Sequence, residues 1–145
     1  MLLILEGIDK CGKTTFAQKF KNCATIKHST KLEDATAVLL DAVKRVKLGE
    51  FVILDRSFLS EMCYGPVYRG EMRITPAKFM QICKALKGID YCILYFSRPE
   101  GQHEEYDAND EFEKEPDKLA MVEARYKDYI ARYKNRFNIY EIQYK

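Results

Sequence analysis

The sequence predicts an α/β fold, a three-layer sandwich in which helices cover a parallel sheet of about five strands. Two observations predict this class. Short continuous apolar runs, typical of strands covered on both faces, alternate with longer segments of helical periodicity. The composition, 47% apolar and 32% charged over 145 residues, fits a single globular core. We therefore expect one domain over residues 1–145, with right-handed crossovers between its strands.

In the first half of the chain, apolar runs predict strands at residues 2–5 and 51–54, and a weaker run at 24–26 predicts one more. An amphipathic helix over 14–22 follows the first run. A second helix over 32–48 begins after a capping residue, Ser29 or Thr30, and Gly49 lies just past its end.

In the second half, Thr75-Pro76 begins a helix that stops at Gly88, because proline favours the first helical position and glycine the end. A buried strand is expected at 91–96, and an edge strand at 139–142. Between them a long helix opens at Pro116. Its tyrosine stripe falls at helical spacing, which indicates core packing rather than a stacking platform for a ligand.

Composition narrows the function classes. The net charge of +2 is too small to indicate a nucleic-acid or membrane partner by itself. No apolar stretch approaches a membrane span, and a strand that begins at residue 2 leaves no room for a signal peptide. The five cysteines form no C-x-x-C pair, which favours reduced thiols and a cytoplasmic location. We find no metal-ligand cluster, and His28 and His103 stand alone in the sequence.

Residues 7–15 read Gly-Ile-Asp-Lys-Cys-Gly-Lys-Thr-Thr and match the phosphate-binding pattern G-x-x-x-x-G-K-S/T between a predicted strand and a predicted helix. Backbone N–H groups of such a loop surround phosphate oxygens. Lys13 can reach the transferred phosphate, and the Thr14 hydroxyl can ligate Mg²⁺. The pattern predicts a nucleoside triphosphate site, for which we expect ATP, at Gly7, Ile8, Asp9, Lys10, Cys11, Gly12, Lys13, Thr14 and Thr15.

The pair Asp55-Arg56, at the end of the 51–54 strand, is the second segment that indicates a phosphate-binding site. Carboxyl ends of parallel strands meet at one edge of a sheet, so Gly7, Asp55 and Ser97 should border one crevice. There Asp55 can complete a Mg²⁺ site with Thr14. Arg56 offers a planar fork that suits a phosphate group.

These two segments resemble the thymidylate kinase family. Glu6-Gly7, Asp9 and Gly12-Lys13-Thr14-Thr15 match that family's E-G-x-D-x-x-G-K-S/T-T loop. A second stretch, D-R-x-x-x-S-x-x-x-Y, is similar to the family's D-R segment and includes Asp55, Arg56, Ser60 and Tyr64. The resemblance implies the fold of the P-loop nucleoside-monophosphate kinases.

The resemblance also implies roles for single residues. Asp9 would contact the acceptor sugar or organise the loop, Arg56 would hold the acceptor phosphate, and Tyr64 would lie near the acceptor base. Lys10 would stabilise the transferring phosphoryl group, as in the kinases whose lid lacks a catalytic arginine. The catalytic set is then Lys10, Lys13 and Arg56.

The predicted lid, residues 98–117, is strongly acidic and cannot clamp a triphosphate by charge, which fits this class of kinases. The chain also departs from the family pattern. Residues 26–30 replace an R-E-P stretch, and Gly65 replaces a glutamine that reads the base. Arg69 or Arg73, in the expected loop over 65–74, could replace an acceptor arginine that is missing from this sequence.

The leading hypothesis is ATP- and Mg²⁺-dependent phosphoryl transfer to a nucleoside monophosphate, most of all a deoxynucleotide. One alternative is a deoxynucleoside kinase that uses Glu6 as base. Others are a kinase acting on DNA or RNA ends or modified bases, and a non-catalytic nucleotide binder. The expected partner is a small nucleotide, not a membrane. Whether the chain forms a homodimer stays open.

Overall fold

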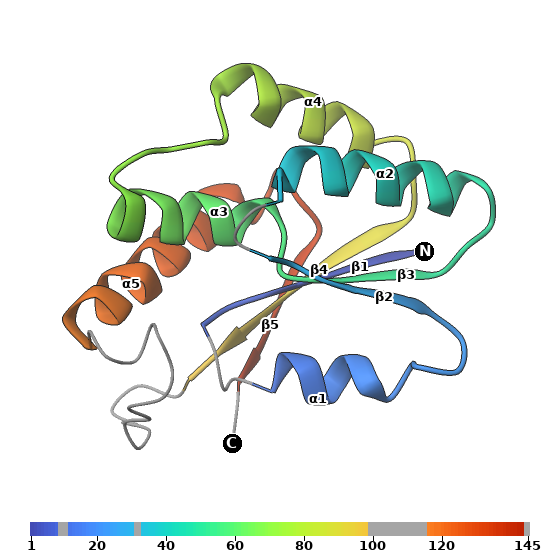
Figure 1. Ribbon diagram of the computed structural model, residues 1–145, viewed down its shortest axis with the longest axis horizontal. Helices are drawn as coiled ribbons and strands as arrows, with labels where there is room; N and C mark the ends of the chain where they lie inside the picture. The colour runs from blue at the N-terminus through green and yellow to red at the C-terminus, as the bar shows by residue number, and fades with distance from the viewer. Residues whose placement is uncertain (9–11, 31–32, 99–115, 144–145) are drawn as a thin grey trace.

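A computed structural model describes residues 1–8, 12–30, 33–98 and 116–143. Strands and helices alternate along most of this part of the chain, as the sequence predicts (Figure 1). The strands are β1 (Leu2–Glu6), β2 (Thr25–His28), β3 (Val52–Asp55), β4 (Tyr91–Ser97) and β5 (Ile139–Gln143). The helices are α1 (Lys13–Gln18), α2 (Ala35–Lys47), α3 (Phe58–Tyr64), the π-helix η1 (Gly65–Arg69), α4 (Pro76–Leu86) and α5 (Pro116–Tyr133).

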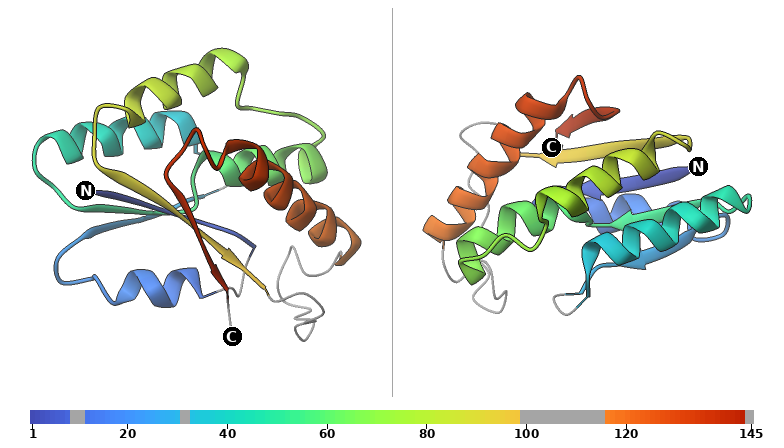
Figure 2. Two further views of the ribbon diagram at one scale, coloured as in Figure 1. Left: turned by 180° about the vertical axis from the view of Figure 1, so that it is seen from behind. Right: turned by 90° about the horizontal axis from the view of Figure 1, so that it is seen from above.

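The five strands form one parallel sheet in the order β2-β3-β1-β4-β5. Among the described helices, α1 covers one face, whereas α2, α3 and α4 lie over the other with α5 beside α3 (Figures 1 and 2). The predicted three-layer sandwich with about five strands is therefore confirmed. The weak run at 24–26 is the edge strand β2, which extends to His28.

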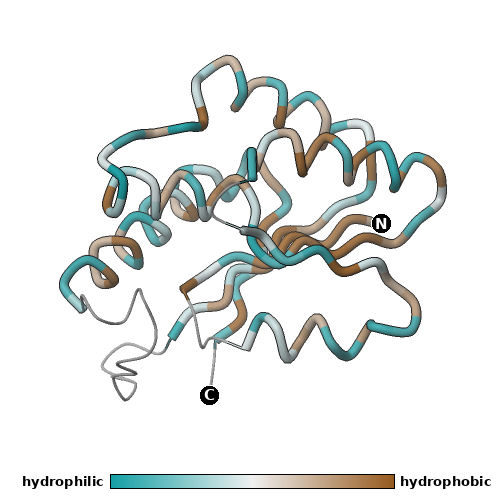
Figure 3. Tube along the Cα trace, viewed as in Figure 1, coloured by the Kyte–Doolittle hydropathy of each residue, from teal (hydrophilic) through white to brown (hydrophobic). Residues whose placement is uncertain are grey.

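The central strands form the core because nearly all their side chains are apolar (Figure 3). Leu2, Ile4 and Leu5 of β1, Ile53 of β3 and Ile93 of β4 are fully buried. Each such side chain contributes about 1.5–3 kcal/mol to the free energy of unfolding. This packing fixes the sheet and therefore the positions at which its strands end.

Two helix ends differ from the prediction. Helix α1 ends at Gln18, not at residue 22, because the next amides bond three residues back, as Phe20 N–H does to the Ala17 carbonyl at 3.0 Å. Helix α2 begins at Ala35 and is capped by Asp34, whose carboxylate accepts from the Thr36 and Ala37 amides. The predicted caps, Ser29 and Thr30, were wrong.

The expected loop over 65–74 begins instead as a π-helix, η1. Gly65 joins it to α3, and a Cβ at this position would lie only 2.8 Å from the backbone oxygen of Glu71. The return of the chain to residue 71 thus needs a residue without a side chain.

Helix α5 begins at Pro116 as predicted, and its tyrosine stripe faces the core. Tyr126 is fully buried and its ring stacks on Tyr95 of β4, with 5.5 Å between centroids. Further along, Tyr133 and Phe137 contact Phe79 of α4. These contacts hold α5 against both the sheet and the neighbouring helices.

Several predictions fall on residues that the structure does not describe. Asp9, Lys10 and Cys11 lie outside the described residues, and so does most of the predicted lid, residues 99–115. Within the described part of the chain, no helix combines the length and apolar character required to cross a bilayer.

Candidate functional site

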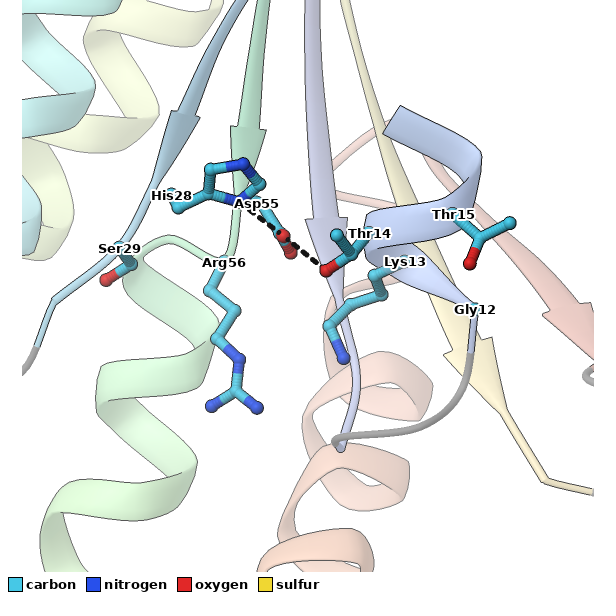
Figure 4. Close-up of a pocket in the computed structure, with 8 residues that line it drawn as sticks. All are labelled: Gly12, Lys13, Thr14, Thr15, His28, Ser29, Asp55 and Arg56. Atoms are coloured by element: carbon cyan, nitrogen blue, oxygen red, sulfur yellow. Dashed lines mark hydrogen bonds and ion pairs between the residues drawn. The ribbon is translucent and has the colours of Figure 1, made fainter. Parts of the chain in front are cut away.

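A cavity of about 200 Å³ opens at the carboxyl edge of the sheet, where β1, β2 and β3 end (Figure 4). Gly12 and the first turn of α1 border it on one side, and the end of β2 with the β3–α3 turn borders it on the other. Most of its side chains can donate hydrogen bonds or carry charge. The lining residues are Gly12, Lys13, Thr14, Thr15, His28, Ser29, Asp55 and Arg56.

Thr14 and Asp55 meet in this cavity from opposite sides. The Thr14 hydroxyl donates to Asp55 Oδ2 at 3.0 Å, although the two residues are 41 positions apart. Asp55 ends β3 beside Leu5 of β1, so the parallel register brings its carboxylate to the start of α1. A hydroxyl and a carboxylate at this spacing form an oxygen-rich pair that suits a hard divalent cation.

Lys13 is 95% buried, since only 5% of its surface is exposed, and it lies at the base of the loop. Its ammonium donates to the Ile8 carbonyl at 2.5 Å. Gly12, directly before it, has φ of +86°, a left-handed conformation that glycine adopts without strain. Lys13 therefore places a positive charge at the wall of the cavity.

His28 also points to Asp55, and its Nδ1 lies 2.8 Å from Asp55 Oδ2 (Figure 4). The two residues are direct partners in the β2–β3 register, which explains the contact. His28, which stands alone in the sequence, thus gains a carboxylate partner in the fold. Asp55 Oδ2 is approached by a nitrogen from one side and by the Thr14 hydroxyl from the other.

Arg56 leaves the sheet in an unusual conformation. Its φ is +76°, which is costly for a residue with a side chain and tends to occur at functional sites. Its amide donates to the Leu5 carbonyl at 2.9 Å, which continues the sheet bonding by one residue. The guanidinium lies 4.9 Å from the Tyr64 ring centre, and it borders the same cavity as Lys13.

Glu6 is fully buried behind this turn and does not line the cavity. Its carboxylate accepts from the Ser57 amide at 2.6 Å, the Ser60 hydroxyl at 2.8 Å and the Tyr126 hydroxyl at 3.1 Å. Burial raises the pKa of the Glu6 carboxyl to about 7, although these hydrogen bonds favour the ionised form. Glu6 thus supports the Arg56–Ser57 turn from behind through the Ser57 amide.

Of the residues predicted from the sequence, the structure brings Gly12, Lys13, Thr14, Thr15, Asp55 and Arg56 together around the cavity. Gly7 directly follows the end of β1, and a Cβ there would meet the Phe96 carbonyl oxygen at 2.3 Å. Ile8 is buried, and its carbonyl accepts the hydrogen bond from the Lys13 ammonium. Tyr64 is buried below Arg56 rather than at the cavity surface.

Arg69 does not line the cavity. Its guanidinium pairs with both carboxylate oxygens of Glu61 at 2.5 Å, which directs it along α3 and η1. The neighbouring Arg73 pairs with Glu71 at 3.0 Å. The role of Arg69 in acceptor binding stays a prediction, and its present contacts are with the protein itself.

Sequence reasoning missed two contributors to the site. His28 could have been found by extending the weak strand at 24–26 by two residues, since its last residue then faces the end of β3. The tyrosine stripe of α5 gave no sign that Tyr126 bonds Glu6, because that contact depends on how a distant helix folds back.

Comparisons with known proteins agree with this architecture. Neither the known protein-family models nor the curated protein sequences contain a match to this chain. Among solved structures, YorR from Bacillus subtilis, crystallised with phosphorylated GDP, is 19% identical with a TM-score of 0.70, and the match covers 100% of this chain and 85% of that one. A thymidylate kinase from Ehrlichia chaffeensis is 18% identical with a TM-score of 0.55, over 100% and 87% of the two chains.

A deoxyadenosine kinase from M. mycoides with bound dCTP is 13% identical, with a TM-score of 0.56 over 99% of this chain and 90% of that one. At these identities the comparisons show the fold. The chain therefore has the α/β fold that thymidylate kinases and deoxyadenosine kinases share, and its cavity lies at the carboxyl edge of that sheet.

Proposed function

We propose that this protein transfers a phosphoryl group from ATP to a nucleoside monophosphate, and that a deoxynucleotide such as thymidylate is the acceptor. The observation that carries the proposal is the cavity in which Lys13, Thr14 and Asp55 face Arg56. Phosphoryl transfer between two anions needs alignment and charge neutralisation more than it needs a base. The cavity supplies cationic and hydrogen-bonding groups for both partners.

On the donor side, the loop ending in Gly12 would hold the phosphates of ATP. The Lys13 ammonium would exchange the Ile8 carbonyl for a phosphate oxygen. Thr14 and Asp55 fit a Mg²⁺ ion because their oxygens already lie 3.0 Å apart. A Mg²⁺ ion bound there would offset negative charge on the phosphate oxygens.

On the acceptor side, Arg56 would bind the monophosphate through its planar guanidinium. Its left-handed backbone fixes the side chain toward the cavity, and Glu6 supports the same turn from behind through the Ser57 amide. Lys10 remains our candidate for stabilising the transferring group. Asp9 and Tyr64 remain candidates for contact with the acceptor.

The contacts weigh against two alternatives. A nucleoside acceptor would need a carboxylate base, and the candidate, Glu6, is enclosed by three donors and has no exposed surface. A nucleic-acid acceptor would need a basic groove. Two basic residues of β2 and α2 are already paired with carboxylates, Lys27 with Glu33 at 2.9 Å and Arg45 with Asp41 at 3.0 Å.

The test is an acceptor screen. The protein is incubated with Mg²⁺ and ATP labelled at the γ-phosphate, together with each nucleoside, each nucleoside monophosphate and short DNA ends. We expect label to enter a nucleoside diphosphate. Labelled nucleosides or DNA ends would point to the alternative acceptors, and ATP binding without any labelled product would indicate a non-catalytic nucleotide binder.

A further inference from the structure

Tyr68 belongs to an aromatic stack that reaches Arg56, and neither of the two sequence patterns includes it. Tyr68 lies in η1, four residues after Tyr64, and its ring stacks on the Tyr64 ring with 5.9 Å between centroids and 25° between planes. The Arg56 guanidinium in turn lies 4.9 Å from the centre of the Tyr64 ring. Tyr68 is therefore linked to the candidate acceptor arginine through one intervening ring.

An aromatic ring holds a guanidinium in a different way from a carboxylate. The face of the ring attracts the cation, whereas the N–H groups lie in the plane of the guanidinium and point to other acceptors. A carboxylate takes those N–H groups and offsets the positive charge, as Glu61 does for Arg69. A ring beneath Arg56 is thus compatible with an arginine that binds an anionic substrate.

The orientation of the Tyr64 ring depends on its neighbours, because Tyr64 is buried. Tyr126 of α5 meets this ring edge-on, with 6.4 Å between centroids and 79° between planes. Tyr68 covers it from η1, a π-helix, and such segments occur often at functional sites. The Lys118 ammonium, near the start of α5, lies 5.6 Å from the centre of the Tyr68 ring. Side chains from three helices therefore hold the stack in place.

We propose that Tyr68 is a positioning residue for the acceptor: its stacking on Tyr64 fixes the ring against which the Arg56 guanidinium lies, and so fixes the direction in which Arg56 faces the cavity. The inference rests on the proposed function, in which Arg56 binds the acceptor phosphate. Tyr68 itself touches no substrate in this arrangement. Its loss should weaken acceptor binding and leave the donor residues Lys13 and Thr14 in place.

The experiment compares Tyr68→Leu with Tyr68→Phe by steady-state kinetics, using ATP and the monophosphate selected by the acceptor screen. Tyr68→Leu should raise KM for the monophosphate about fivefold and leave KM for ATP within about twofold. Tyr68→Met, a second variant without a ring, should behave like Tyr68→Leu. Tyr68→Phe keeps the ring, so its KM for the monophosphate should stay within about twofold of wild type.

Tyr133→Leu is the matched control for the loss of a stacked tyrosine. Tyr133 is partly buried, as Tyr68 is, and it stacks on Tyr129, four residues before it, with 6.0 Å between centroids. Neither Tyr133 nor Tyr129 lines the cavity. Thermal denaturation should show that both leucine variants fold and are less stable than wild type. Only Tyr68→Leu should raise KM for the monophosphate.

A double-mutant cycle tests whether Tyr68 acts through Arg56. In Arg56→Ala protein, Tyr68→Leu should raise KM for the monophosphate no further, because the residue that it positions is already absent. Multiplied increases in the double variant, equal increases in both KM values for Tyr68→Leu, or the same increase for Tyr133→Leu would overturn the role of Tyr68 and leave the proposed function standing. Absence of phosphoryl transfer to any monophosphate by the wild-type protein would overturn both.

Discussion

Tyr126 donates a hydrogen bond to Glu6 at 3.1 Å, across 120 positions of the chain. Both side chains are fully buried, and the Ser60 hydroxyl of α3 lies 2.8 Å from the Glu6 carboxylate and 2.7 Å from the Tyr126 hydroxyl. The contact ties the end of β1 to α3 and α5, directly behind the turn that presents Arg56. A polar network in the core thus positions the candidate acceptor residue without itself bordering the cavity.

The first prediction concerns the pH dependence of stability. The pKa of Glu6 rises from an ordinary 4.5 to about 7 on folding, so between these values the folded protein binds more protons than the unfolded chain. The free energy of unfolding should therefore fall by about 3 kcal/mol as pH rises from 4.5 to 7, and then level off. Urea denaturation across this pH range measures the change in the free energy of unfolding. The Glu6→Gln variant should lack it, because Gln cannot titrate. Equal slopes for the two proteins would refute the assignment.

The second prediction concerns Tyr126. Tyr126→Phe removes one donor from a buried carboxylate and leaves the ring stacked on Tyr95. We expect the free energy of unfolding to drop by about 1–3 kcal/mol. Tyr140→Phe, which removes a hydroxyl from an exposed tyrosine, is the matched control and should change stability by less than about 0.5 kcal/mol. Similar losses in both variants would show that the Glu6 contact contributes little.

The third prediction tests Gly65. Alanine normally stabilises a helical position relative to glycine by about 1 kcal/mol. At Gly65 the new Cβ would lie 2.8 Å from a backbone oxygen, so we expect Gly65→Ala to destabilise the protein by about 1–3 kcal/mol instead. At Gly88 the nearest atom would be 3.7 Å away, which makes Gly88→Ala a suitable control. A thermal shift upward for Gly65→Ala would contradict the proposed close approach.

The fourth prediction concerns Lys13. Lys13→Ala should reduce kcat by a factor of about 10² to 10³, since it removes a buried cation beside the transferred phosphate. Lys19→Ala, just past α1 and exposed, should leave kcat unchanged. Steady-state kinetics measures both variants, and an unchanged kcat for Lys13→Ala would exclude its proposed role.

The fifth prediction concerns Arg56. Arg56→Ala should raise KM for the monophosphate at least tenfold and leave KM for ATP within about threefold. Arg132→Ala, which removes an exposed arginine paired with Asp128, serves as control. An equal increase in both KM values would assign Arg56 to the donor instead.

Much of the fold and six of the eight residues that line the cavity could be predicted from local sequence. Apolar runs and helical periodicity located the strands, and parallel strand ends explain why Asp55 and Thr14 meet. His28 was missed because the edge strand is short and mostly exposed, so its apolar signal ended at residue 26. The burial of Glu6 and the π-helix at Gly65 depend on contacts between distant segments. A local sequence pattern does not predict such contacts.

The most direct test of the central claim is a crystal structure with ADP and the nucleoside monophosphate chosen by the acceptor screen. We expect the β-phosphate of ADP at Lys13 and Thr14, and the acceptor phosphate at the Arg56 guanidinium, within one continuous cavity. An acceptor phosphate bound away from Arg56, or a donor bound away from Lys13, would contradict the account.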